Sequence, residues 1–145
     1  MTNNIALLVS RILLAAIFIP AGVMKFGDIG GTAGYISSVG LPAGTLLAWL
    51  TAIFETVAGI AILIGFQTRL AAVLLALFCV FTGLYFHSGA IVMPDFPEAA
   101  NNMLTGMNQG MMYKNLAMAG GFLALFVAGA GAWSVDARRG VLAPA

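Results

Sequence analysis

Residues 46–87 read LLAWLTAIFETVAGIAILIGFQTRLAAVLLALFCVFTGLYFH and decide the fold of this chain. Two apolar runs, residues 46–65 and 69–87, are separated only by a short turn that begins at Gly65. An apolar helix needs about 20 residues to cross a hydrocarbon layer ~30 Å thick. Because the turn is just long enough to reverse the chain, the stretch predicts two membrane-spanning helices in an antiparallel hairpin.

Two further apolar runs flank this hairpin, at about residues 5–24 and 115–134. Helices satisfy their own backbone groups in lipid, and the sequence lacks the alternating pattern of barrel strands. The sequence therefore predicts an all-α, four-helix transmembrane bundle that forms a single domain, residues 1–145. The two longer connections, residues 26–45 and 88–114, carry glycines and prolines and are predicted to be loops that lie against the membrane surface.

The composition supports a membrane protein. Of the 145 residues, 61% are hydrophobic and 8% are charged, against roughly 25% charged residues in a soluble domain. The formal net charge of +1 leaves no basic surface for nucleic acid, so no nucleic-acid partner is expected. A single cysteine, Cys79, excludes an internal disulfide and a thiolate cluster, and no metal is expected.

The distribution of basic residues predicts the orientation of the bundle. Arg69, Arg138 and Arg139 lie beside one set of helix ends, and Lys25 and Lys114 lie beside the other. By the positive-inside rule, both termini and the hairpin turn are predicted to be cytoplasmic. The two long loops are then outside.

Each predicted helix carries polar groups on a face of small residues. A charge in mid-membrane costs roughly 2.5 to 3.5 kcal/mol, so these faces are expected to look inward. The predicted inward faces are Arg11, Ala15, Phe18, Gly22 and Lys25; Ala48, Ala52, Glu55 and Gly59; Ala72, Ala76, Cys79, Gly83 and His87; and Lys114, Ala117, Gly121, Ala124 and Ala128.

Arg11 and Glu55 are predicted to form a buried ion pair. Counted from the predicted helix ends, the two side chains differ in depth by roughly 6 Å, which an arginine side chain can span. One interpretation is a structural pair that fixes the helix register. The other is a proton relay.

Lys25, His87 and Lys114 lie at the outer ends of their helices and are predicted to converge on one pocket. Imidazole groups exchange protons near neutral pH, so His87 is a candidate to accept a proton from a quinol headgroup or to donate one to a quinone. The alternatives are a histidine hydrogen-bonded to a loop and lysines that anchor the membrane edge by snorkelling. The lysines are also candidates for a clamp on an anion or a carbonyl oxygen. Cys79 is interpreted as a packing residue.

Met103, Met107 and Met111 are spaced by four residues, which on a helix forms one stripe. The first interpretation is an amphipathic helix at the membrane interface. The alternative is binding of Cu(I) by the thioethers, since soft sulfur ligands suit that ion.

Several short motifs, in their order along the chain, resemble those of the DoxX-like family of membrane proteins. They are Arg11, Ala15, Phe18, Pro20-Ala21-Gly22 and Lys25-Phe26; Glu55, Gly59 and Gly65; Thr68-Arg69-Leu70-Ala71-Ala72; Phe86-His87; Tyr113-Lys114-Asn115-Leu116-Ala117; and Trp133-Ser134-Val135-Asp136. The resemblance covers essentially the whole chain. It implies a multi-pass, four-helix protein of the bacterial-type inner (plasma) membrane.

The resemblance also implies a function linked to quinones, because some relatives are membrane subunits in quinone-linked oxidation of sulfur compounds or in oxidoreductase assemblies. We therefore expect a membrane subunit of a quinone-linked oxidoreductase system, with quinone as its cofactor near the outer face. The predicted cofactor-binding residues are Lys25, His87, Lys114 and Asn115, and the predicted catalytic residues are His87, Glu55 and Arg11. Membrane lipid, a redox partner protein and further copies of the chain are the candidate partners. The alternative function is a non-enzymatic membrane scaffold or a small-solute transport element for a partner protein.

Overall fold

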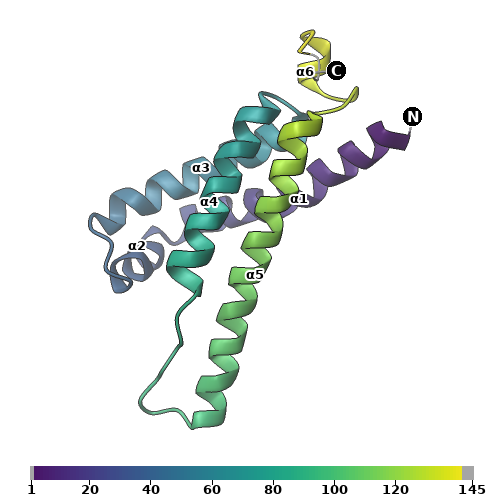
Figure 1. Ribbon diagram of the computed structural model, residues 1–145. Helices are drawn as coiled ribbons and strands as arrows, with labels where there is room; N and C mark the ends of the chain where they lie inside the picture. The colour runs from purple at the N-terminus through teal and green to yellow at the C-terminus, as the bar shows by residue number, and fades with distance from the viewer. Residues whose placement is uncertain (1, 142–145) are drawn as a thin grey trace.

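The computed structural model describes residues 2–141, which form six helices and no strand (Figure 1). The helices are α1 (Thr2–Gly27), α2 (Ile29–Ser38), α3 (Gly44–Ile64), α4 (Thr68–His87), α5 (Glu98–Ala128) and α6 (Val135–Arg138). Four of them, α1, α3, α4 and α5, are long and apolar enough to cross a membrane. The predicted all-α architecture with four membrane-spanning helices is confirmed.

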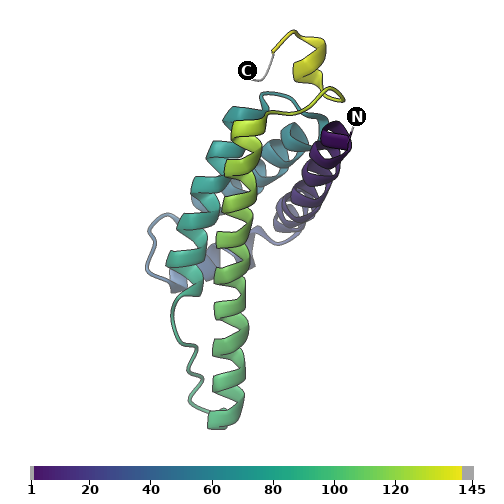
Figure 2. The same ribbon diagram turned by 45° about the vertical axis from the view of Figure 1, so that its right-hand side comes forward.

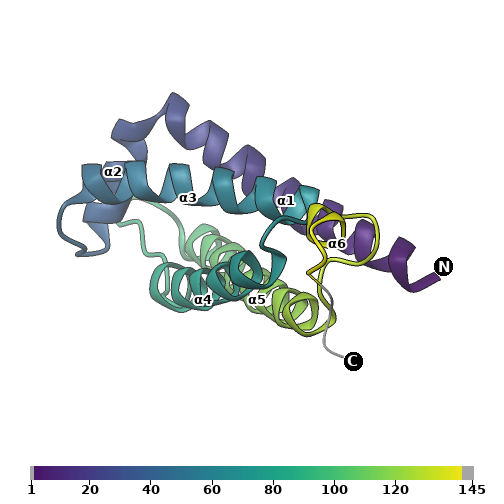
Figure 3. The same cartoon turned by 90° about the horizontal axis from the view of Figure 1, so that it is seen from above.

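The four long helices form two pairs that lie as two layers (Figure 3). α1 packs mainly against α3, and α4 packs mainly against α5. Glycines let the first pair close, because a Cβ at Gly22 would collide with Ala52 and Thr56 of α3. In the same way, a Cβ at Gly59 would collide with Ile19 of α1. Small residues at a helix crossing allow this close approach of the two backbones.

The turn between α3 and α4 reverses the chain as predicted, but the two helices then diverge (Figure 1). Gly65 ends α3 with a φ of +69°, a left-handed conformation that glycine adopts without Cβ strain. The amide of Phe66 donates to the carbonyl of Ala61 over 2.9 Å. Because each helix closes on a different partner, α3 and α4 pack only loosely on one another.

Both connections predicted to be loops contain helix. Residues 26–45 include α2, whose first turn is capped by Asp28, since its carboxylate accepts from the amide of Gly31 over 2.8 Å. Residues 88–114 are non-helical only as far as Pro97 and then continue as the first half of α5. The prediction of a loop is wrong there because a proline is tolerated where a helix begins, and Pro97 occupies that position.

α5 is consequently much longer than predicted and also ends earlier. Its 31 residues span about 46 Å at 1.5 Å per residue, so it extends beyond the end of α4 (Figure 2). It ends at Gly129, whose φ is +76°, so residues 129–134 of the predicted fourth helix are not helical.

The inward faces predicted for the first three membrane helices are confirmed, apart from the half-buried end groups Lys25 and His87. The face predicted for the fourth is wrong, since its alanines are exposed. The buried positions of α5 are instead Asn115, Met118, Ala119, Phe122 and Leu125. The other helices present small residues to the interior, so large side chains from α5 must fill the space between them. Phe122 does so, packing edge-on against Phe18 with ring centroids 5.5 Å apart.

Candidate functional site

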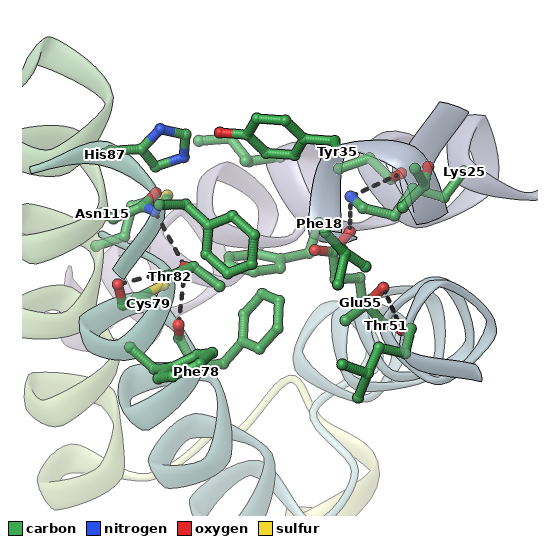
Figure 4. Close-up of a pocket in the computed structure, with 18 of the residues that line it drawn as sticks. Phe18, Lys25, Tyr35, Thr51, Glu55, Phe78, Cys79, Thr82, His87 and Asn115 are labelled. Carbon is green, nitrogen blue, oxygen red and sulfur yellow. Dashed lines mark hydrogen bonds and ion pairs between the residues drawn. The ribbon is translucent and has the colours of Figure 1, made fainter. Parts of the chain in front are cut away.

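A cavity of about 280 Å³ lies between the two helix pairs, on the side of the bundle where α1 meets α2 (Figure 4). α2 contributes Tyr35 and Ile36 to its lining. The remaining walls combine aromatic rings with polar and charged groups from the four long helices. Those groups include Phe18, Phe78, Phe81 and Phe86, and Lys25, Thr51, Glu55, Thr82, His87, Lys114 and Asn115. For convenience we call this part of the molecule the cavity end.

The four predicted cofactor-binding residues all line this cavity. Lys25, His87 and Lys114 come from α1, α4 and α5, and Asn115 follows Lys114. Asn115 is buried, Lys25 and His87 are half-buried, and Lys114 is exposed at the edge of the cavity. The structure therefore brings together the residues that the sequence placed in one pocket, while their binding role stays a prediction.

Glu55 also lines the cavity, where it forms an ion pair with Lys25. Lys25 Nζ donates to Glu55 Oε2 over 2.6 Å. The Glu55 side chain is 7% exposed, whereas that of Lys25 is 27% exposed. Lys114 is a second positive charge within electrostatic reach of the Glu55 carboxylate. The cavity thus contains two cations and one acid.

The predicted pair of Arg11 with Glu55 is wrong, and the register of α1 on α3 explains the error. Gly22 lies against Ala52 and the following turn of α3, so Glu55 lies close to the level of Gly22 and about one turn from Lys25. Arg11 lies eleven residues before Gly22 in α1, which is about 16 Å along the helix axis at 1.5 Å per residue. Depths counted from predicted helix ends do not contain this register, because it depends on which glycines meet which backbone.

Arg11 lies instead at the other end of the bundle, beside the turn between α3 and α4. It is 1% exposed, and its Nη2 donates to the carbonyl of Trp133 over 2.5 Å. Gly65 leaves room for the guanidinium, since a Cβ there would collide with it. Asp136 supplies an opposite charge nearby. Arg11 is not among the residues that line the cavity.

His87 is held in one orientation by Asn108 of α5. Its Nδ1 lies 2.9 Å from Asn108 Oδ1, while Asn108 Nδ2 donates to the carbonyl of Gly89 over 3.0 Å. Since the amide nitrogen of Asn108 is engaged elsewhere, the hydrogen-bond network assigns the proton of neutral His87 to Nδ1. Nε2 is then the ring nitrogen that can accept a further proton.

Asn115 is fixed by a chain of hydrogen bonds to α4. Its Nδ2 donates to Thr82 Oγ1 over 3.1 Å, and that hydroxyl donates to the carbonyl of Phe78 over 2.8 Å (Figure 4). Gly83 leaves space for the Asn115 side chain between the two helices. One hydrogen of Nδ2 is engaged by Thr82, and Asn115 lines the cavity with its position fixed in this way.

Aromatic rings line the cavity on two sides. Tyr35 of α2 lies 5.6 Å from Phe86 between ring centroids, and Phe18 lies 6.4 Å from Phe78 on the other side (Figure 4). Partial burial raises the pKa of the Tyr35 phenol, so it remains protonated at neutral pH and can donate a hydrogen bond. Planar rings and a phenol favour a flat ligand with polar edges.

Tyr35, Thr82 and Cys79 are among the lining residues that were not predicted as functional from the sequence. Tyr35 lies on α2, which was predicted to be loop, although Asp28 just before residues 29–38 is a recognisable helix-capping signal. Thr82 acts through Asn115, a pairing that requires the α4–α5 register. Cys79 is buried, in agreement with the packing interpretation, but it also lines the cavity.

Met103, Met107 and Met111 are exposed and do not line the cavity. They lie on the part of α5 towards its beginning, so the predicted helical stripe is confirmed, while its position at the membrane interface stays a prediction. Thr105 and Asn101 of this segment hydrogen-bond to residues 88–97. Within residues 2–141, no group of three or more His, Cys, Asp or Glu side chains is arranged to hold a metal ion.

Comparison with known proteins identifies relatives over nearly the whole chain. The family model DoxX matches residues 6–88. Inner membrane protein YqjF of Escherichia coli (strain K12) is 38% identical over 134 residues, which are 92% of this chain and 92% of YqjF. Inner membrane protein YphA of the same organism is 34% identical over 92% of this chain and 90% of its own. The protein named "Putative oxidoreductase CatD" of Bacillus subtilis (strain 168) is 34% identical over 51% of this chain and 54% of its own. No solved structure matches this chain.

Proposed function

This chain belongs to the DoxX family of membrane proteins, and we propose that it binds a quinone or a similar amphiphile. In this proposal it is the membrane subunit of a quinone-linked oxidoreductase system and works with a redox partner protein. It is a multi-pass protein of the bacterial inner membrane, the compartment in which quinones are dissolved. The observation that carries the proposal is the aromatic-walled cavity into which Lys25, Glu55, His87, Lys114 and Asn115 project.

The size of the cavity supports a headgroup rather than a whole ligand. Its volume of about 280 Å³ is slightly below the roughly 300 to 1,000 Å³ typical of sites that enclose drug-sized molecules. A ring with polar edges suits that volume, and its lipid-like tail would extend among the apolar side chains that face the membrane. A free ion would leave the aromatic walls without a partner.

The residues of the cavity are suited to the oxygens of such a ring. A quinone supplies two-electron chemistry in which its ring oxygens take up or release protons. Lys25 and Lys114 can hold a carbonyl oxygen, and the phenol of Tyr35 can donate a hydrogen bond to one. His87 can take up a proton at Nε2, because Nδ1 is committed to Asn108. Glu55 keeps Lys25 in place at the cavity through the 2.6 Å ion pair.

The printed name of one relative supports the same class of function. CatD is named as an oxidoreductase, and the similarity covers about half of each chain. The transfer of an oxidoreductase role to this chain is part of the proposal. Since the polar residues of the cavity offer proton donors and acceptors, the redox partner protein is assigned the electron transfer itself.

The test is co-purification of quinone with the full-length protein. The protein is isolated with its native lipid, and extracted quinone is quantified per mole of protein for the wild type and for Lys114→Ala. We expect quinone with the wild type and a loss of about tenfold in Lys114→Ala, because that substitution removes a cation at the cavity edge without touching the buried core. Circular dichroism and thermal unfolding check that the variant is folded.

Two results would contradict the proposal. One is absence of quinone from the wild-type protein, together with unchanged respiration in a strain from which the gene for this protein is deleted. This result would favour the scaffold interpretation. The other is equal quinone content in the wild type and Lys114→Ala, which would mean that the bound quinone lies outside this cavity.

A further inference from the structure

A second cavity, of about 470 Å³, lies at the opposite end of the molecule, which we call the turn end. It is lined by the beginning of α1, the beginning of α4, the segment that links α5 to α6, and α6 itself. Asn4, Thr68 and Arg69 bring hydrogen-bond donors to its wall. The Oδ1 atom of Asn4 accepts from the amide of Ala132 over 3.0 Å, so the Asn4 NH₂ group remains as a donor.

Several buried donors at the turn end have no acceptor within residues 2–141. Thr68 is 1% exposed and lines the cavity, yet its hydroxyl has no hydrogen-bond partner among the described residues. The same is true of Arg69 Nη2, and of Nε and Nη1 of the 1% exposed Arg11 nearby. Buried polar groups in folded proteins are nearly always hydrogen-bonded. Such a cluster indicates an acceptor that the described part of the chain does not supply.

Asp136 does not supply that acceptor. Its two carboxylate oxygens accept from the backbone amides of Gln67 and Thr68, each over 2.8 Å. The carboxylate therefore caps the beginning of α4 and offsets one positive charge. The hydroxyl of Thr68 and the guanidinium of Arg69 remain available to a ligand.

The charges of the two ends differ in sign. The turn end has four arginines, Arg11, Arg69, Arg138 and Arg139, against Asp136 alone. We count with the cavity end the non-helical residues 88–97 and the beginning of α5, which extend from it. This part of the molecule has two lysines, Lys25 and Lys114, and four acidic residues, Asp28, Glu55, Asp95 and Glu98. The turn end is thus the part of the molecule that attracts anions.

Aromatic side chains favour a position of the turn end at the depth of the lipid headgroups. Trp133 is 55% exposed and Phe66 is 40% exposed there. The Arg139 guanidinium lies 5.1 Å from the centroid of the Phe66 ring. Exposed tryptophan together with arginine is typical of the membrane–water interface. These side chains favour placement of the second cavity near the level of phospholipid phosphates.

From these observations we propose that the second cavity binds a phosphate group, supplied by the headgroup of an anionic phospholipid. The phosphate oxygens accept from the Thr68 hydroxyl, the Arg69 guanidinium and the Asn4 amide, and acyl chains run down the surface of the bundle. Arginine suits such a group because its fork of N–H donors matches phosphate geometry. This site is separate from the cavity end and does not depend on the quinone proposal.

The test measures lipid binding by the full-length protein in detergent, using native mass spectrometry and the shift of the unfolding temperature. The probes are phosphatidylglycerol, a galactosyl diacylglycerol that has no phosphate, and inorganic phosphate. We expect phosphatidylglycerol to bind at least tenfold tighter than the galactolipid. Thr68→Val, which keeps the shape of the side chain, and Arg69→Gln should each weaken phosphatidylglycerol binding about tenfold. Arg139→Gln is the matched control, since it removes one charge at the same end without altering the cavity wall, and should change binding less than threefold.

The arms of this experiment separate the sources of the phosphate and can overturn the proposal. If inorganic phosphate stabilises the protein and Thr68→Val abolishes that effect, the site is supported with a free anion as its ligand. Equal losses in Arg69→Gln and Arg139→Gln, with none in Thr68→Val, would show attraction by diffuse charge and contradict a site. Equal binding of phosphatidylglycerol and galactolipid would contradict it as well.

Discussion

The turn end and the cavity end use similar side chains for different purposes. At the turn end, Asp136 accepts from two backbone amides, and Arg11 donates to a backbone carbonyl, so these charges hold segments of the chain together. At the cavity end, Lys25 and Glu55 bond to one another and face a cavity. A carboxylate whose two oxygens both accept from backbone amides anchors the fold, whereas a charge bonded to another side chain at a cavity wall remains available to a ligand. The partner of a buried charge, more than its residue type, therefore indicates its role.

The largest expected effect comes from removing the anchor at the turn end. Asp136→Ala leaves two backbone amides without their acceptor and Arg11 without its nearby negative charge, so we expect a loss of about 3 kcal/mol in unfolding free energy. Thermal unfolding in detergent measures it. Asp95→Ala, at an exposed position, is the control and should change the unfolding free energy by less than ~0.5 kcal/mol. Similar losses in both variants would show that Asp136 is not an anchor.

Gly65→Ala should be the next most damaging change. It places a Cβ at a φ of +69° and against the guanidinium of Arg11, with an expected cost of about 2 kcal/mol. Gly110→Ala lies inside α5 with open space around it and should be neutral or stabilising by up to ~1 kcal/mol. If both variants unfold at the same temperature, Gly65 is not required for the turn.

At the cavity end, Glu55→Gln should lower the unfolding free energy by about 1 to 2 kcal/mol, because it leaves Lys25 without its ionic partner. The loss is smaller than for a fully buried pair because Lys25 is partly exposed. Adding Lys25→Met should recover part of the loss, and a double-mutant cycle should give a coupling of at least ~1 kcal/mol. The same cycle for Glu55→Gln with Arg11→Met should be additive. Coupling of Glu55 to Arg11, and not to Lys25, would restore the pairing predicted from the sequence.

The smallest effect is expected at the methionine stripe, which lines neither cavity. Replacing Met103, Met107 and Met111 by leucine should change the unfolding free energy by less than ~0.5 kcal/mol, because all three side chains are exposed and the volumes are similar. Titration with Cu(I) under reducing conditions should show no difference from the wild type. A loss of tight Cu(I) binding in the triple variant would favour the thioether interpretation instead.

How far the sequence predicts this molecule depends on whether a feature is local or requires register. The four membrane helices and the turn at Gly65 follow from hydrophobicity over about 20 residues and a glycine between two runs. The convergence of Lys25, His87 and Lys114 follows from their common position at the outer ends of the predicted apolar runs, although Lys114 lies in the middle of α5. Each of these features is encoded within one helix or one turn.

The errors arise where two segments must meet. The partner of Glu55 depends on how α1 and α3 slide along one another, which is set by the contacts of Gly22 and Gly59. The buried face of α5 depends on the space that the small residues of the other helices leave, and Phe122 fills it. The periodicity of a single helix contains neither the register of α1 on α3 nor the space left beside α5. Tyr35 was missed for a local reason. The glycines around it indicated a loop, and the capping signal of Asp28 was not used to predict a helix there.

The most direct test of the central claim, that the cavity end binds a quinone headgroup, compares one cation from each end of the molecule. Binding of the short-tailed ubiquinone-1 to the purified full-length protein is titrated for the wild type, Lys114→Gln and Arg139→Gln. Each variant removes one exposed positive charge, but only Lys114 lines the cavity. We predict saturable binding by the wild type, a Kd raised about tenfold in Lys114→Gln, equivalent to about 1.4 kcal/mol, and a change below twofold in Arg139→Gln. Absence of saturable binding, or equal effects of the two substitutions, would contradict it.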